Sequence, residues 1–279
     1  MVIRALICAL LAGLAPALPA AAGDAPRRVV SMNLCTDQLA MMLAEPGQLI
    51  SVSNLARDPV SSAMVDEAGA YPENHGAAEE VFLLKPDLVL AGSYTNQAAT
   101  ALLRRLGVRV EVLDPATSME DVHAGILAVG RALGQEDAAA DMAARFEADL
   151  AALRAAPASG LRAALYYANG YSLGDQTLAG QILASAGFAN VTAEAGLSSG
   201  GFLPLEVLIV SNPDLVIQGD RYPGAARAEE LLDHPALSAL GPQLPRGALA
   251  DRDWICGTPH VLRAAADLRA AQATLHGGH

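Results

Sequence analysis

The sequence predicts an α/β protein of two Rossmann-like lobes that are bridged by a long helical connector. Short apolar segments alternate with segments of helical periodicity over residues 23–116 and again over residues 158–275. An alanine-rich stretch of helical character separates the two series, and a similar phrase of sequence occurs once in each of them.

In the first series, four apolar segments predict strands: "RRVVSMN", "QLISVS", "PDLVLAG" and "VRVEVLD". Three segments predict helices between them: "CTDQLAMMLAE", "AAEEVFLLK" and "NQAATALLRRLG". The polar stretch over 54–76 is rich in turn residues and predicts a mixture of loop and short helix. Alternation of this kind is typical of a parallel sheet.

Residues 117–157 predict the helical connector. Ser118 and Asp121 have the spacing of a capping box, and Gly134 is expected to divide the connector into two helices. One face of the second helix collects apolar side chains: Met142, Phe146, Leu150 and Leu153.

The second lobe repeats the alternation after the loop "PASG". Strands are predicted at "LRAALYYA", "PDLVIQG" and "GALADRDWI". Helices are predicted at "QTLAGQILASAG", "PLEVLIVS", "RAEELLDHPALSAL" and "GTPHVLRAAADLRAAQ". Residues 276–279 are expected to form a disordered tail.

Residues 1–22 have the pattern of a signal peptide: Arg4, an apolar run too short to span a bilayer, and small residues at the cleavage site. We therefore expect an exported, periplasmic protein. Export would leave Cys35 and Cys256 in an oxidising compartment, where they form either a disulfide or two free thiols. The net charge of −12, with a single lysine, argues against nucleic acid or an anionic membrane as a partner.

The phrase "AEEVFLLKPDLVLAG" (78–92) aligns without a gap with "LEVLIVSNPDLVIQG" (205–219). The offset is 127 residues, from Pro86 to Pro213 (213 − 86). Glu79 and Glu206 stand at the same place in the two copies, seven residues before the proline. Two lobes of like design would therefore carry these glutamates on corresponding edges.

With these features the sequence resembles the substrate-binding proteins of ABC importers for metal chelates, the class that includes cobalamin, ferric-siderophore and haem binders. The resemblance rests on "RVVSMNLCTDQLAMML", the glutamate–proline element in both lobes, the helical connector, "GDQTLAGQILASAGFANV" and "DWICGTPHVLRAAADL". It implies that Glu79 and Glu206 dock into arginine pockets of a permease dimer that works with ATPase subunits. It also implies a ligand cleft between the two lobes, and a monomer that needs no cofactor of its own and carries a metal chelate as cargo.

Ligands of such sheets bind at the carboxyl ends of strands, which makes the residues there cleft candidates. The candidates are Asn33, Arg57, Tyr71, His75, Tyr94, Tyr171, Arg221, Tyr222, Trp254 and His260. Aromatic walls suit large flat ligands, and arginines suit anionic ones. Trp254 could equally be a core residue, and each histidine is either an axial ligand of the cargo metal or an ordinary surface residue.

Two other functions compete with this one. A binding protein for free zinc or manganese would need three or four His, Asp or Glu ligands that converge from both lobes. A secreted enzyme would need a recognisable set of catalytic residues, and the sequence has no G-x-S-x-G, H-E-x-x-H or P-loop motif.

Overall fold

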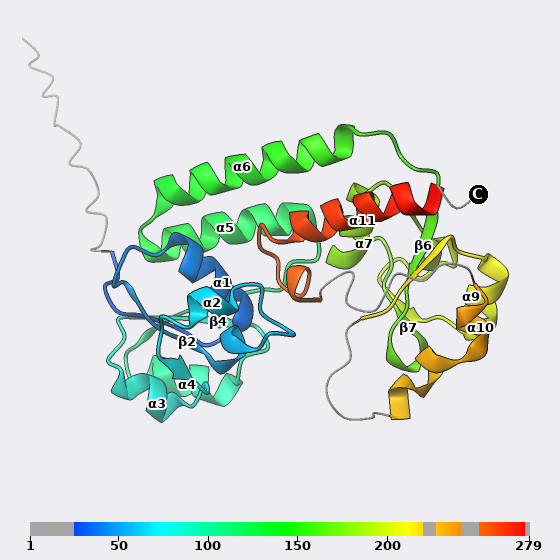
Figure 1. Ribbon diagram of the computed structural model, residues 1–279. Helices are drawn as coiled ribbons and strands as arrows, with labels where there is room; N and C mark the ends of the chain where they lie inside the picture. The colour runs from blue at the N-terminus through cyan, green and yellow to red at the C-terminus, as the bar shows by residue number, and fades with distance from the viewer. Residues whose placement is uncertain (1–24, 220–226, 241–250, 277–279) are drawn as a thin grey trace, which may run out of the picture.

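Figure 1 shows two α/β lobes that lie beneath a pair of long helices in this computed structural model. The structure describes residues 25–219, 227–240 and 251–276. The predicted signal peptide (1–22), Arg221, Tyr222 and the end of the predicted tail lie outside the described residues. No helix in the described ranges is long and apolar enough to cross a bilayer.

The first lobe is built on a five-stranded parallel sheet with the strand order β3-β2-β1-β4-β5. Its strands are β1 (Val29–Ser31), β2 (Leu49–Ser53), β3 (Glu73–Asn74), β4 (Leu88–Gly92) and β5 (Arg109–Leu113). The central strands β1 and β4 are buried along their whole length, as the apolar segments predicted. β3 is a short edge strand within the stretch where sequence predicted only loop and helix.

Helices connect these strands in the predicted alternation: α1 (Leu34–Leu43), the 3-10 helix η1 (Asn54–Arg57), α2 (Val65–Ala68), α3 (Ala78–Leu83) and α4 (Gln97–Arg105). Asn33 caps α1 and Asn96 caps α4, each by accepting two backbone N–H groups. The Asn33 cap lets α1 begin directly after β1, and it leaves the polar side chain of Asn33 at the carboxyl edge of the sheet.

The connector consists of α5 (Met119–Leu133) and α6 (Glu136–Ala155), which run antiparallel. The predicted capping box of Ser118 and Asp121 is present. Gly134 divides the helices and adopts φ 71°, a left-handed conformation that favours glycine. Phe146 and Leu150 are buried on the predicted apolar face of α6.

The second lobe is less regular than sequence predicted. A three-stranded parallel sheet has the order β10-β6-β8, and β7 pairs with β9 in an antiparallel ribbon. The strands are β6 (Arg162–Leu165), β7 (Tyr171–Ser172), β8 (Ala189–Asn190), β9 (Gly201–Phe202) and β10 (Leu215–Ile217). The helices are η2 (Ala168–Gly170), α7 (Leu178–Ser185), α8 (Val191–Glu194), α9 (Leu205–Ser211), η3 (Arg227–Asp233) and α10 (Pro235–Ser238).

One prediction near the C-terminus is wrong. Residues 251–253 of the predicted strand "GALADRDWI" form the 3-10 helix η4 (Asp251–Asp253), because Trp254 and Ile255 donate backbone hydrogen bonds back to the carbonyl of Asp251. The final helix α11 (Val261–His276) extends into the predicted tail as far as His276.

One apolar core joins the lobes to the connector. It includes Leu88 of the first sheet, Ile126 and Phe146 of the connector, and Leu165 and Leu268 of the second half. α11 packs against both α6 and α7. The connector therefore supports both lobes through continuous side-chain packing.

Candidate functional site

A pocket of about 310 Å³ lies at the carboxyl ends of β1, β4 and β5. Asn33, Tyr94 and Asp114 are among the polar residues of its wall, whereas Ile255 and Gly257 reach it from the segment before α11. Carboxyl ends of parallel strands are the usual place for a ligand in this type of sheet. The pocket is therefore the candidate binding site.

Asn33 has its side chain fixed by the backbone around it. Its Oδ1 accepts the N–H of Cys35 at 3.0 Å and that of Thr36 at 3.4 Å. A Cβ at Gly92 would lie 2.9 Å from Nδ2 of Asn33, so glycine is needed for this close approach. The amide group is thus held rigidly at the pocket wall, where it can hydrogen-bond a ligand at little entropic cost.

Tyr94 is 89% exposed beside the same pocket. The preceding residue, Ser93, donates its hydroxyl to Asp114. Among the described residues that line the pocket, Asp114 and Asp121 are the charged ones. An exposed ring beside two carboxylates suits a large ligand that offers a flat face and hydrogen-bond donors such as amides.

A second hollow, of about 460 Å³, adjoins the pocket along β5 and α5. It shares Asp114 and Asp121 with the pocket and adds two arginines, Arg109 and Arg131. Arg109 is paired with Glu111 at 3.0 Å. The hollow widens the accessible region along β5 and the connector helix α5.

Cys35 and Cys256 form a disulfide bond, with their Cα atoms 5.0 Å apart. The segment around Cys256 is fitted against the first lobe and the connector. A Cβ at Gly257 would lie 2.3 Å from Cβ of Ala116, and the hydroxyl of Thr258 lies 3.4 Å from Oε1 of Gln38. The disulfide therefore fastens this late segment to the first lobe at the rim of the pocket.

α1, whose residues Cys35 and Thr36 line the pocket, also carries a buried carboxylate. Asp37 is completely buried and accepts hydrogen bonds from the backbone N–H of Ser53 at 3.1 Å and from its hydroxyl at 2.5 Å. Burial raises the pKa of Asp37 to about 6, against the opposing effect of its hydrogen bonds with Ser31 and Ser53. Asp37 thus links α1 to β2 and changes its charge in mildly acidic solution.

The Nε2 atom of His260 is out of reach of a ligand. It is buried without a hydrogen-bond partner among the described residues. Burial, reinforced by the charge of Arg263, lowers the pKa of His260 to about 4 despite the opposing charges of Asp253 and Glu67. The ring is therefore neutral at pH 7, but its Nε2 could coordinate a cargo metal only after a local rearrangement.

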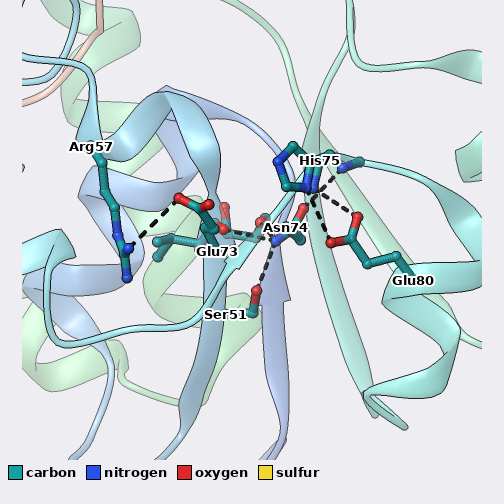
Figure 2. Close-up of polar contacts among 9 residues, drawn as sticks. Ser51, Arg57, Glu73, Asn74, His75 and Glu80 are labelled. Atoms are coloured by element: carbon teal, nitrogen blue, oxygen red, sulfur yellow. Dashed lines mark hydrogen bonds and ion pairs between the residues drawn. The ribbon is translucent and has the colours of Figure 1, made fainter.

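Arg57, Tyr71 and His75 lie outside the described lining of the pocket and have local partners, as Figure 2 shows for Arg57 and His75. Arg57 donates to the backbone carbonyl of Tyr71 and lies 3.7 Å from Glu73. His75 donates its backbone N–H to Glu80 at 2.8 Å, and its Nδ1 lies 3.3 Å from the same carboxylate.

The remaining aromatic candidates separate into two kinds. Trp254 is 6% exposed and belongs to the core, with its Nε1 donating to Asp251 at 3.1 Å, so it has the core role that the sequence left as the alternative. Tyr171 is half-exposed in the β7–β9 ribbon, where it pairs with Phe202, away from the pocket.

Glu79 and Glu206 both lie exposed in the first turns of matching helices, α3 and α9. Glu80, the neighbour of Glu79, is occupied by His75. The resulting hydrogen bonds, above all the one from the backbone N–H of His75, lower the pKa of Glu80. Position 207, which corresponds to Glu80, is a valine. The exposed carboxylate that occurs in both lobes is therefore that of Glu79 in the first lobe and of Glu206 in the second.

Sequence reasoning missed several pocket residues. Ser93 and Asp114 directly follow β4 and β5, so the rule that selected Tyr94 applied to them as well. Ile255 and Gly257 carried no such signal, because only the tertiary structure brings their segment to the first lobe. Within the described residues, no three His, Cys, Asp or Glu side chains come together in a way that could hold a metal ion.

A family model described as "Periplasmic binding protein" matches residues 29–242, which cover most of both lobes and the whole connector. The chain belongs to the periplasmic binding protein family. A "Cobalamin-binding protein" of Halobacterium salinarum is 30% identical over 212 residues, which are 73% of this chain and 57% of that protein. An "Uncharacterized ABC transporter substrate-binding lipoprotein", YvrC of Bacillus subtilis, is 27% identical over 45% of this chain and 40% of its own.

Solved periplasmic binding proteins have the same fold as this member of the family. The haem-binding protein HutB of Vibrio cholerae superposes with a TM-score of 0.71 at 20% identity, covering 89% of this chain and 98% of its own. The vitamin B12 binding protein BtuF of Vibrio cholerae gives a TM-score of 0.62 at 18% identity, covering 90% and 98%. The chain spans little more than half the length of the H. salinarum relative that it matches.

Proposed function

We propose that this protein is a periplasmic solute-binding protein that captures a metal chelate and delivers it to an inner-membrane ABC importer. This proposal is supported by two features that occur together: a pocket at the strand ends, and two exposed glutamates at matching positions of the two lobes. The relatives are binding proteins, and the proposed role requires no catalysis by this chain and no cofactor of its own. ATP hydrolysis by the partner supplies the energy.

The pocket wall favours a chelate that carries amides. Tyr94 offers a flat apolar face, Asn33 offers a fixed amide, and Asp114 offers a carboxylate that accepts hydrogen bonds. Asp121, whose carboxylate caps α5, adds a second negative charge to the wall. The same two carboxylates repel the carboxylates of haem or of an acidic siderophore. A corrinoid is therefore the first cargo to test, in agreement with the description of the H. salinarum relative.

The test is a calorimetric titration of the ligand-free, exported form with cobalamin, haemin and a set of ferric siderophores. Saturable one-to-one binding of cobalamin in the micromolar range or tighter is expected. Binding of haemin or of a siderophore alone would keep the chelate-binding function and change the cargo. Equimolar free zinc or manganese bound without a chelate would replace the proposal by the competing metal-binding function.

Docking is tested with the variant Glu79→Lys/Glu206→Lys. A Glu–Arg pair gives both orientation and charge-assisted hydrogen bonds, so reversal of both charges abolishes uptake into proteoliposomes that contain the permease dimer and its ATPase subunits. Chelate affinity stays unchanged, because neither glutamate lines the pocket. Glu120→Lys, an exposed glutamate of the connector, is the control and leaves uptake intact. Loss of chelate affinity in the double variant would contradict the docking role.

A further inference from the structure

The helices that carry Glu79 and Glu206 also expose apolar side chains at matching positions. On α3, Leu83 is 77% exposed, and on α9, Val210 at the same place in the alignment is 84% exposed. The residues before them, Phe82 and Ile209, are 42% and 36% exposed. Single exposed apolar residues are common on proteins and need no explanation, but a pair repeated in register in two lobes does.

The backbone shows that the two copies are the same structural unit. Val81 and Leu208 are completely buried on the inner faces of their helices. Lys85 and Asn212, each followed by proline, both adopt a left-handed conformation, with φ of 51° and 44°. The turn that ends each helix is therefore alike, and the apolar pair just before it lies on the outside in both lobes.

Each unit also places an exposed ring four residues before its glutamate. In the first lobe this residue is His75, and in the second it is Phe202, which is 65% exposed. Figure 2 shows His75 held in place by Glu80. In both lobes, apolar or aromatic groups thus lie before and after one exposed carboxylate along the chain.

We infer that the apolar pairs Phe82–Leu83 and Ile209–Val210 form, with Glu79 and Glu206, two equivalent docking surfaces for a two-fold symmetric partner. This inference rests on the proposed function and identifies the chemistry of its partner. Each half of the permease dimer offers an apolar recess beside a cationic group. The carboxylate orients the complex, whereas burial of the apolar pair supplies affinity that does not depend on salt.

The docking surfaces are tested by measuring how tightly the chelate-loaded protein binds the permease dimer. The dimer, with its ATPase subunits, comes from the same organism and is held in nanodiscs. Leu83→Ser and Val210→Ser are compared with Glu79→Ala and Glu206→Ala at low and at high salt. Each serine variant is expected to raise Kd about tenfold at both salt concentrations. The loss of affinity caused by each alanine variant is smaller at high salt, because ions already screen the glutamate charge that the substitution removes.

Matched controls separate docking from folding. Leu106→Ser changes another exposed apolar residue, 46% exposed after α4, which lies outside the repeated unit. It is expected to bind like the unmodified protein. Leu83→Met and Val210→Leu keep the apolar surface and retain affinity. Equal thermal midpoints and equal chelate affinity for all variants show that only the docking surface has changed.

The outcomes distinguish this inference from the proposed function. Normal binding by the serine variants together with weak binding by the alanine variants overturns the apolar surfaces and keeps the glutamates. Normal binding by all four single variants overturns both surfaces as docking sites. If the unmodified protein does not bind any ABC permease of the organism, the proposed function fails and the inference fails with it.

Discussion

Cys35 and Cys256 are joined by a disulfide bond although 221 positions separate them in the sequence. Cys35 lies in the first turn of α1, and Cys256 lies between η4 and α11. Because α11 packs on α7 of the second lobe, the bond fixes the second half of the chain to the first lobe close to the pocket.

Removal of this bond is expected to destabilise the protein without unfolding it. Cys35→Ser/Cys256→Ser releases a very long covalent loop in the unfolded chain, which lowers the free energy of unfolding by about 2–5 kcal/mol. Urea unfolding followed by circular dichroism measures the loss. The unmodified protein under reducing conditions should show the same midpoint as the serine variant. Identical midpoints for the oxidised protein and the variant would contradict the prediction.

Asp37 is expected to reduce stability as the pH rises. Its pKa is about 6 in the folded protein and 3.8 in the unfolded chain, so the unfolded chain loses the proton first. Its contribution therefore lowers the free energy of unfolding between pH 4 and pH 6, by about 3 kcal/mol. Asp37→Asn removes this pH-dependent contribution. The stability of the variant relative to the unmodified protein should therefore increase from pH 4 to pH 7. A constant difference across that range would show that Asp37 is charged throughout.

His260 has the opposite dependence. Its pKa is about 4 in the folded protein against 6.5 in the unfolded chain, because burial disfavours the imidazolium ion. As the pH falls from 6.5 to 4, the unfolded chain takes up the proton and stability is lost. His260→Gln should therefore resist acid better than the unmodified protein, as thermal midpoints at pH 4.5 and pH 7.5 would show. NMR titration that gave an ordinary histidine pKa would refute this assignment.

Tyr94 is expected to contribute its ring, not its hydroxyl, to ligand binding. Tyr94→Ala removes an aromatic face from the pocket and weakens binding of the chelate about tenfold. Tyr94→Phe keeps the ring and retains most of the affinity. Calorimetry with the chelate identified by the titration measures both. An equal loss in the two variants would mean that the hydroxyl makes the contact.

Local sequence patterns predicted the first lobe better than the second. Strand residues such as Val89 and Leu90 are buried on both faces, so they form an unbroken apolar run that marks a central strand. In the second lobe, Ala189–Asn190 and Gly201–Phe202 form strands of two residues, which are too short to show any alternation. Residues 251–253 were predicted as a strand and form a helical turn, because hydrogen bonds to Asp251 determine their conformation.

The sequence by itself determined the α/β alternation and the capped connector with its break at Gly134, because each depends on residues near one another in the chain. It also determined the repeat that aligns Glu79 with Glu206, because each copy is a short local pattern that can be compared directly with the other. Only the tertiary structure decided the pairing of Cys35 with Cys256, the core position of Trp254 and the arrival of Gly257 at the pocket of the first lobe. These contacts join residues that lie far apart in the sequence. Packing between separate helices and strands determines which residues come into contact, and such packing leaves no periodic signal in the local sequence.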